Sequence, residues 1–317
     1  MKKIKAVMLV ILFIAVFTVS ALVTVALTGS APNRLLRVDW NEEVGTEYLN
    51  LEYENDYGHK YDLYIPSGMD KTQPQNLILF IHGGSFNSGS KEDGTDWCKY
   101  YTAKGYITAS MDYSLQTVVE GATLNRMNSE VLSCVYAIKD QCEKYGISIG
   151  GMATCGVSAG GTLALNFAYS CAETSPIPVK FVFQLVAPAD FEPSDWGILK
   201  KVNGIKTDSE FVESMTGMKF TEEEIAQGKH EEAVTAVSPA RLVNEKSVPT
   251  LCGYGLRDHV VPQNQRELLV KALKDNKVTY DYLEFPHSNH GMYADLDILQ
   301  EFLELQSEHQ YQCHYLS

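Results

Sequence analysis

Ser158 is the residue of this chain whose setting most clearly predicts chemistry. It is the central residue of Gly156-Val157-Ser158-Ala159-Gly160, a Gly-x-Ser-x-Gly spacing that holds a serine on a sharp turn between a strand and a helix. Side chains in place of the two glycines would collide with that strand or helix. A strand-like run, 149–154, precedes the turn, and an apolar helix-like run, 162–169, follows it. Because the motif also occurs by chance, a catalytic Ser158 requires an oxyanion hole, an acid and a histidine elsewhere in the chain.

Donors for a developing oxyanion are predicted just after the apolar run 76–82. Gly83 and Gly84 follow this run, and without side chains their N–H groups can approach a substrate oxygen closely. The N–H of Ala159, next to the candidate nucleophile, completes the predicted oxyanion hole. An ordinary turn from strand to loop would also use two glycines, so the pair has a second interpretation. His82, directly before the glycines, is expected to brace their loop rather than to act as a base.

Asp258 is the predicted acid. It closes segment 253–258, just past a predicted strand, and a carboxylate in that place faces the ligand crevice of a parallel sheet. Alternatively, Asp258 caps the helix that starts near Pro262. Asp190, which follows the preceding strand, is the other candidate acid. The glycine-rich turn and the proline around Asp258 favour Asp258 over Asp190.

The predicted base is His290, which follows the last predicted strand in the segment 286–291. Gly291 would allow its ring to swing over the serine, whereas His287 is expected to stabilise the loop. A His-x-x-His pair can also bind a metal, but neither a third cluster of ligands nor a metalloprotease helix accompanies it. We therefore predict no metal and no cofactor.

The candidate residues occur in the order Ser158, Asp258, His290 along the chain. This is the order of the α/β-hydrolases, and it differs from the orders in chymotrypsin and subtilisin. Together with the glycine pair, four separately placed features stand in one workable order. Such an arrangement is much rarer by chance than any one of its parts.

Strand-like and helix-like segments alternate along the chain, which predicts a mostly parallel sheet covered by helices on both faces. The predicted strands are 47–53, 60–65, 76–82, 106–113, 149–154, 179–186, 249–255 and 279–285, and the predicted helices are 96–103, 125–145, 162–169, 263–275 and 296–309. The first two strands are expected to form an antiparallel hairpin. Residues 191–240 interrupt the rhythm and are expected to form a cap-like insertion over the site. The alternative is a surface excursion that packs its aromatics on the flank of the sheet.

The N-terminal segment 1–31 combines three lysines with an uncharged run, 6–27, long enough to cross a bilayer core as a helix. It is either a membrane anchor or a cleaved signal peptide, and its length favours the anchor. Residues 32–45 are expected to be a linker, and residues 46–317 an α/β-hydrolase domain. Both interpretations of the N-terminal segment place this domain outside the cytoplasm, membrane-anchored or secreted.

Charge and cysteine content narrow the choice of partners. The net charge of −14 disfavours nucleic acid and anionic membrane surfaces as ligands. The 7 cysteines show no metal-type spacing, and their odd number prevents complete pairing within the chain. Cys134 and Cys142, eight positions apart on one predicted helix, would lie about 12 Å apart, too far for a disulfide. Small buried thiols are therefore favoured over disulfides.

These motifs together resemble those of the α/β-hydrolase esterases and lipases, and in particular the HGG/GxSAGG carboxylesterase group that includes acetyl-xylan and feruloyl esterase-like enzymes. The residues that carry the resemblance are His82-Gly83-Gly84, Asp112-Tyr113-Ser114-Leu115, Gly156-Val157-Ser158-Ala159-Gly160-Gly161, Asp258-x-x-Val261-Pro262 and His290-Gly291. The resemblance spans roughly residues 45–310. It implies Ser158 as nucleophile, His290 as base and Asp258 as the residue that orients the base.

The chain departs from that pattern at three positions. Ser85, Val157 and Ser114 stand where many relatives carry a glycine, an acidic residue and an arginine. These changes leave the predicted chemistry intact, but the motifs then do not define a substrate.

The expected function is hydrolysis of carboxylic esters with short acyl chains through an acyl-enzyme on Ser158. Small-molecule or carbohydrate esters are the expected substrates, and the sequence does not define the oligomeric state. Two other classes of function are compatible with the fold. An exopeptidase or other amide hydrolase would use the same three residues, whereas a binding protein that has lost catalysis is expected to lack one of them.

Overall fold

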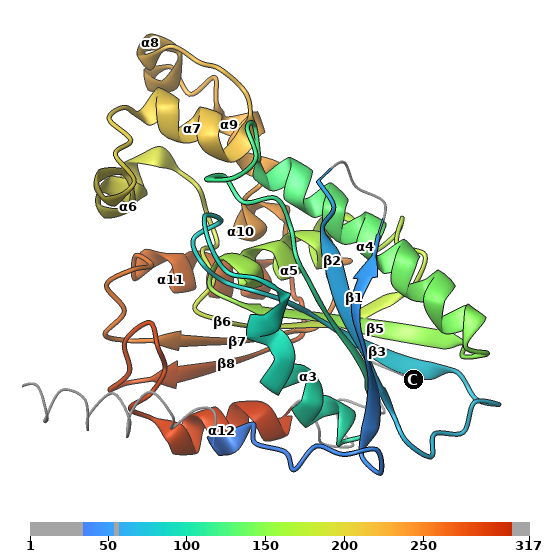
Figure 1. The fold of residues 1–317 in the computed structure, drawn as a ribbon. Coiled ribbons are helices and arrows are strands. Elements are labelled where there is room, and N and C mark those ends of the chain that lie inside the picture. The colour runs from blue at the N-terminus through green and yellow to red at the C-terminus, as the bar shows by residue number, and fades with distance from the viewer. Residues whose placement is uncertain (1–33, 54–56, 306–317) are drawn as a thin grey trace, which may run out of the picture.

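The computed structural model describes residues 34–53 and 57–305 of the chain. One eight-stranded sheet crosses this part of the chain in the order β1-β2-β4-β3-β5-β6-β7-β8 (Figure 1). The strands are β1 (Gly45–Glu52), β2 (Lys60–Pro66), β3 (Gln75–Ile81), β4 (Ile107–Met111), β5 (Ile149–Val157), β6 (Val179–Leu185), β7 (Thr250–Gly255) and β8 (Tyr280–Phe285). β1 and β2 pair antiparallel and the remaining strands pair parallel with one another, which confirms the predicted sheet.

The central strands are mostly apolar and largely buried because both of their faces are covered. In β3, Leu77, Leu79 and Ile81 belong to the core on one face of the sheet, while Ile78 and Phe80 belong to the core on the other face. Side chains that alternate between two buried faces require a continuous hydrophobic run rather than an alternating one. That property also leaves the carboxyl ends of the strands as the place where polar side chains can gather.

Helices cover both faces of this sheet (Figure 1). α4 (Leu124–Lys144), α5 (Ala159–Ser170) and α11 (Asn264–Asp275) lie on one face, and α3 (Thr95–Thr102) and α12 (Leu296–Leu305) lie on the other. α4 begins where the Thr123 hydroxyl accepts the N–H of Arg126, the usual way to satisfy a free donor in the first turn. The predicted helices are confirmed, although the last one was expected to reach residue 309, beyond the described residues.

The segment 191–240 contains six short helices, most of which project from one end of the sheet, while the last packs beside α5 and α11 (Figure 1). They are η2 (Pro193–Trp196), α6 (Gly197–Val202), α7 (Asp208–Thr216), α8 (Glu222–Ala226), α9 (Glu231–Thr235) and α10 (Pro239–Leu242). A row of stacked rings attaches them to the body of the protein. Phe86 packs on Phe191 at 6.0 Å between ring centroids, Phe191 stacks on Trp196 at 5.6 Å, and Trp196 stacks on Phe211 at 6.3 Å.

None of the helices in the described ranges is long and apolar enough to span a bilayer. The predicted anchor or signal peptide, 1–31, lies outside those ranges, as does Cys313. The other cysteines are all free, and every one of them except Cys171 is buried, which confirms the preference for thiols over disulfides. Burial raises the pKa of the Cys98 thiol to about 12, so this thiol stays protonated at neutral pH.

Candidate active site

Ser158 sits on a strained turn between β5 and α5. Its backbone has φ 55 and ψ −125, a conformation that costs a non-glycine residue free energy and recurs at functional sites. Its N–H donates to the carbonyl of Leu185 on β6 at 2.8 Å, which fixes the turn against the sheet. A Cβ at Gly156 would strike the backbone of Gly160, and a Cβ at Gly160 would strike the carbonyl of Ile81. The glycines are therefore required by the close approach of β3, β5 and α5.

His290 bridges Ser158 and Asp258. Its Nδ1 lies 2.7 Å from Oδ2 of Asp258, and its Nε2 lies 3.0 Å from Oγ of Ser158. A carboxylate accepts hydrogen bonds, so Nδ1 carries the proton and Nε2 is left to accept the serine hydroxyl hydrogen. The structure thus brings together the three residues predicted as acid, base and nucleophile, in the order that activates a serine.

Asp258 uses its two oxygens for different purposes. Oδ1 accepts the N–H groups of Val260 and Val261 at 2.7 and 3.1 Å and so holds the loop after β7, while Oδ2 faces His290. The alternative role as a helix cap does not apply, because α11 begins only at Asn264. With only 3% of its side chain exposed, the carboxylate has a fixed orientation.

The alternative acid, Asp190, is engaged elsewhere. Arg241 donates to it from Nε at 2.6 Å and from Nη2 at 2.9 Å, a bidentate pair that ties α10 to the segment after β6. No hydrogen bond joins Asp190 to His290 among the described residues. Its role is to anchor the insertion.

The predicted oxyanion donors face the same space as Ser158. Gly83 and Gly84 line the cavity that contains Ser158 and His290, and Ala159 is the first residue of α5. Gly84 has φ 108, and a Cβ at Gly83 would lie 2.8 Å from the carbonyl of Val157. In the described part of the chain, the N–H groups of both glycines lack a backbone acceptor. They are therefore available to a ligand oxygen.

His82 braces this loop, as expected. Its buried ring donates from Nδ1 to the carbonyl of Gly83 at 2.7 Å and stacks on Tyr113 at 4.2 Å between centroids. The Tyr113 hydroxyl in turn donates to the carbonyl of His82 at 2.9 Å. Burial lowers the pKa of His82 below its ordinary value, although the hydrogen bond to Gly83 opposes this, so the ring is neutral at pH 7.

His287 stabilises its loop and takes no part in the bridge. It donates from Nδ1 to Oδ1 of Asp295 at 2.8 Å, and its backbone N–H donates to Oδ2. Burial raises the pKa of Asp295, but hydrogen bonds from Ser288 and His287 outweigh it and hold the pKa below its usual value. Within the described ranges, no group of three potential ligands could hold a metal.

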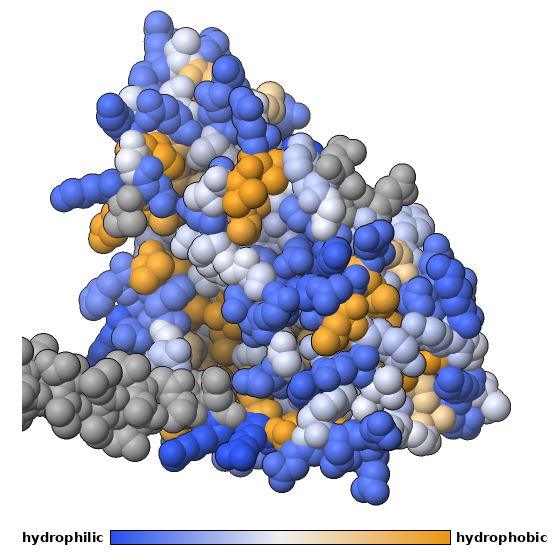
Figure 2. Space-filling model, viewed as in Figure 1, coloured by the Kyte–Doolittle hydropathy of each residue, from blue (hydrophilic) through white to orange (hydrophobic). Residues whose placement is uncertain are grey.

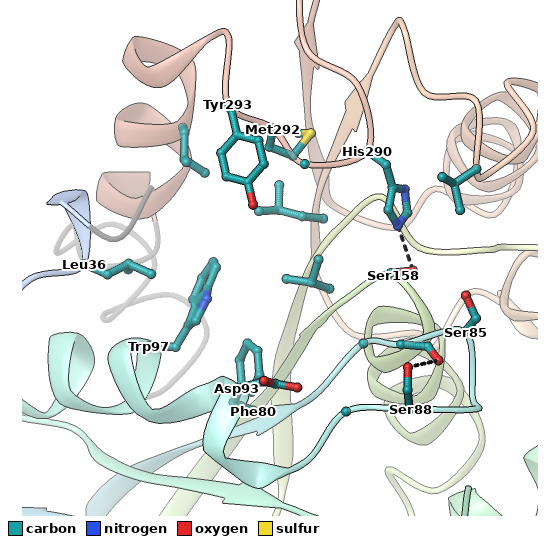
Figure 3. A pocket seen from close by; sticks show the side chains of 18 of the residues that line it. Leu36, Phe80, Ser85, Ser88, Asp93, Trp97, Ser158, His290, Met292 and Tyr293 are labelled. Atoms are coloured by element: carbon teal, nitrogen blue, oxygen red, sulfur yellow. Dashed lines mark hydrogen bonds between the residues drawn. The ribbon is translucent and has the colours of Figure 1, made fainter. Parts of the chain in front are cut away.

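A cavity of about 650 Å³ opens beside Ser158 (Figure 3). Its walls come from segments spread along the described chain, including β3, β6, α3 and α12: Leu36, Phe80, Asp93, Trp97, Leu185, Met292, Tyr293, Leu299 and Leu303. Figure 2 shows hydrophobic side chains gathered in a recess on the face where the carboxyl ends of β6, β7 and β8 lie. A largely apolar hollow with a few polar groups is the usual form of a small-molecule site.

These wall residues were not identified from the sequence. Trp97 lies on a helix that was predicted, and Tyr293 follows His290 by three positions, but neither pattern shows which side chains meet across a cavity. None of residues 191–240 lines the cavity that holds Ser158, but Asp195, Trp196, Ile198 and Leu199 line a second hollow together with the loop 258–262, which carries Asp258. The contact of Phe191 with Phe86 and the stacking of Trp196 on Phe191 attach the start of the segment to the loop after Gly84, and a cap over the site stays a prediction.

Two curated relatives are much longer than the segment of each that aligns with this chain. Esterase LipC of Mycobacterium tuberculosis (strain ATCC 25618 / H37Rv) is 25% identical over 256 residues, which are 75% of this chain and 58% of LipC. The non-reducing polyketide synthase Preu6 of Preussia isomera is 29% identical over 140 residues, 42% of this chain and 6% of the synthase. The chain therefore spans less than two thirds of the length of either relative.

Solved structures share the fold at low sequence identity. A truncated carbohydrate esterase from gut microbiota superposes with a TM-score of 0.66 at 17% identity, over 84% of this chain and 98% of that one. Esterase Est2 of Thermogutta terrifontis gives a TM-score of 0.65 at 19% identity, over 84% and 93%. The model of the BD-FAE family matches residues 61–273, which include Ser158 and Asp258. Since this match covers more than half of the sequence, the chain belongs to the BD-FAE family and has the α/β-hydrolase fold.

Proposed function

We propose that this protein is a serine esterase that hydrolyses carboxylic esters through an acyl-enzyme. The observation that carries the proposal is the position of His290, hydrogen-bonded to Asp258 through Nδ1 and to Ser158 through Nε2. The open cavity beside Ser158 and the two glycine N–H groups supply the other requirements of acyl transfer. The names of Esterase LipC and Est2 support the same reaction class.

In the first half of the reaction, Oγ of Ser158 attacks the ester carbonyl while Nε2 of His290 takes the hydroxyl proton. Asp258 holds the imidazole in the tautomer that can accept it and stabilises the resulting imidazolium. The negative oxygen of the tetrahedral intermediate is received by the N–H groups of Gly83, Gly84 and Ala159. When the intermediate collapses, the C–O bond to the alcohol breaks, and His290 returns its proton to the leaving oxygen.

In the second half, water replaces the alcohol. His290 removes a proton from the water as it attacks the acyl-enzyme, and the same N–H groups receive the new oxyanion. Collapse expels Oγ of Ser158, which recovers its proton from His290, and releases the carboxylic acid. The cycle uses only side chains and backbone groups described above.

We further propose that the acyl group is short and that the cavity takes the alcohol. His290 must stand next to the oxygen that it protonates, and His290 lines the cavity together with Met292 and Tyr293. A volume of about 650 Å³ is far larger than an acetyl group needs, and it suits a ring-sized alcohol. A carbohydrate ester is one candidate, supported by the name of the gut carbohydrate esterase.

A second candidate, an amide hydrolase, is favoured by one observation. Kynurenine formamidase of Salmo salar is 28% identical over 116 residues, 37% of this chain and 36% of the formamidase. The same three residues could cleave either bond. The choice depends on the leaving group, because an amine needs its proton earlier than an alcohol does.

The test is turnover of p-nitrophenyl acetate, butyrate and octanoate by the full chain and by Ser158→Ala, beside a matched series of acyl anilides. Turnover of the acetate that is fastest in the series and lost in the variant supports a short-chain serine esterase. Preference for the anilides would support the amide hydrolase. Equal slow turnover by both proteins would refute both. A fluorophosphonate should add one covalent group, at Ser158, as measured by mass spectrometry.

We also propose that the protein is exported and held at a membrane by its N-terminal segment. The support is the run 6–27, which is uncharged and follows Lys2, Lys3 and Lys5. Sedimentation of the full chain with membranes, with an intact N-terminus by mass spectrometry, is the expected result. Release of a shortened chain would indicate a cleaved signal peptide, and an intact chain in the cytosol would refute export.

A further inference from the structure

The wall of the cavity across from His290 carries one carboxylate, that of Asp93. The residue lies in η1 (Lys91–Gly94), the short helix before α3, and its side chain is directed into the pocket between Trp97 and Ser88 (Figure 3). Oδ2 accepts the N–H of Ser90 at 3.1 Å. Among the described residues Oδ1 has no hydrogen-bond partner, so it can meet a ligand in the cavity.

The charge of Asp93 is not neutralised by an ion pair within the described ranges. Lys91, two positions earlier, points away: its Nζ lies 3.0 Å from Asp62 and 2.6 Å from Glu92, and 4% of the side chain is exposed. Lysine and arginine are absent from the described residues of the cavity wall. The other ionisable groups there are His290, which is held by Asp258, and the phenol of Tyr293.

Near Asp93 the wall combines Ser88 and Gly89 on one side with aromatic rings on the other. Trp97 stacks on Phe80 at 5.6 Å between centroids, and Tyr293 stands across the pocket from Trp97 (Figure 3). Aromatic ring faces attract cations, and the exposed side chain of Asp93 adds a negative charge that acts partly through solvent and is screened by salt. A carboxylate among such walls therefore favours a positive charge in the ligand and repels a negative one.

We propose that Asp93 determines specificity: it admits alcohols that carry an ammonium group and rejects alcohols that carry a carboxylate. The inference rests on the proposed esterase function and on the placement of the alcohol in the cavity. It goes beyond both, because neither the catalytic residues nor the fold select a charge.

The test compares kcat/KM for three acetate esters: that of choline, that of its uncharged carbon isostere dimethylbutanol, and that of hydroxybutanoate. We expect the choline ester to exceed the hydroxybutanoate ester by about tenfold or more at low ionic strength, and the ratio to shrink as salt is added. Asp93→Asn should reduce the ratio severalfold. The asparagine oxygen can still accept the N–H of Ser90, so the loop keeps its support.

Asp96→Asn is the matched control. Asp96 is an exposed acid in the first turn of α3 that does not line the cavity, and the substitution changes the net charge by the same amount. It should leave the ratio unchanged. A wild-type ratio near one, or equal ratios in both variants, would overturn the proposal.

A binding measurement keeps the inference testable if no ester is turned over. In Ser158→Ala, calorimetry with choline and with hydroxybutanoate should detect tighter binding of choline, and Asp93→Asn in that background should remove the difference. Failure of turnover together with charge-selective binding would refute the esterase function alone. Equal binding of the two alcohols would refute the role of Asp93.

Discussion

Among the described residues, the clusters around Ser158 and around Ser114 each combine a serine, a histidine and a carboxylate, and of these two only the first has the geometry of a catalyst. In the cluster at the carboxyl edge of the sheet, His290 lies between the other two side chains, 3.0 Å from Ser158 and 2.7 Å from Asp258. The histidine can therefore receive the serine proton while the carboxylate stabilises the charge that results.

In the second cluster the serine lies in the middle. Ser114 donates its hydroxyl hydrogen to Oε1 of Glu130 at 2.5 Å, and its Oγ lies 3.1 Å from Nε2 of His59. The backbone N–H of Ser114 donates to the other oxygen of Glu130 at 2.7 Å. This hydroxyl satisfies a buried carboxylate, so its proton is directed away from the histidine.

Access separates the clusters as well. Ser114 is fully buried, whereas Ser158 lines the cavity. Gly83 and Gly84 present N–H groups beside Ser158, and Ser114 is not among the residues that share this space. Residue types alone therefore do not identify a reactive serine; the position of the histidine, the donors and an open approach do.

The largest difference in turnover is expected when each of the two serines is replaced by alanine. Ser158→Ala should lower kcat by about 10⁴-fold to 10⁶-fold, since it removes the nucleophile. Ser114→Ala should leave kcat within about threefold, and it should lower the free energy of unfolding by about 1–3 kcal/mol, because a buried acceptor loses its donor. Ester turnover and urea unfolding of both variants measure the contrast. A comparable loss of turnover in the two variants would contradict the expected contrast between the clusters.

Substitution of the two carboxylates, Asp258 and Glu130, should likewise lower turnover in the first cluster and stability in the second. Asp258→Asn is expected to lower kcat by about 10⁴-fold, because the amide can stabilise the wrong tautomer of His290. Glu130→Gln should destabilise the fold and spare turnover in the molecules that remain folded. The measurement is kcat normalised to the fraction titrated by a fluorophosphonate. A small effect of Asp258→Asn would show that another group orients His290.

The oxyanion loop should come next. Gly84→Ala places a methyl group against the carbonyl of Ser88 at φ 108, so the N–H must move, and kcat should fall by about 10²-fold to 10³-fold. Gly105→Ala is the control, because Gly105 also has a positive φ, 95, but open space around it. Gly105→Ala should lower the free energy of unfolding and leave kcat unchanged. Parallel kcat and unfolding measurements separate the two effects.

The smallest effect concerns the neutral histidine behind the loop. Burial lowers the pKa of His82 in the folded state, so the unfolded chain binds more protons as pH falls below about 6.5. The free energy of unfolding should therefore decrease as pH falls from about 6.5 toward the lowered pKa, and this contribution is complete above that range. His82→Gln should flatten this slope in urea unfolding between about pH 5 and 7. Identical pH dependence of the free energy of unfolding in the wild type and in His82→Gln would contradict this prediction.

Local pattern was sufficient for much of the architecture. The apolar run of β3, the fixed Gly-x-Ser-x-Gly spacing around Ser158 and the order of Ser158, Asp258 and His290 are all visible in the sequence itself. The residues of the cavity wall could not be predicted from the sequence, because Leu36, Trp97 and Leu303 meet only through packing against the same face of the sheet.

The insertion 191–240 is a second feature whose position could not be predicted from the sequence. Its polar composition and its place between two strands are compatible with a roof, but the contacts that fix its start, Phe191 on Phe86 and Trp196 on Phe191, join residues far apart in the sequence and could not be predicted. The position of Asp93 beside the cavity was likewise not predictable, because the sequence does not show which exposed carboxylate stands next to the pocket.

The spacing of the catalytic residues has a consequence for biosynthesis. Ser158 leaves the ribosome 132 residues before His290, which at ordinary elongation rates is on the order of ten seconds. Throughout that interval the nascent chain holds a serine without its base, and α12, which forms part of the cavity wall, is translated later still. Hydrolytic competence is therefore acquired only after His290 and α12 have been synthesised, so a chain that stalls or is cut before residue 290 can display the nucleophile turn but cannot attack the esters around it.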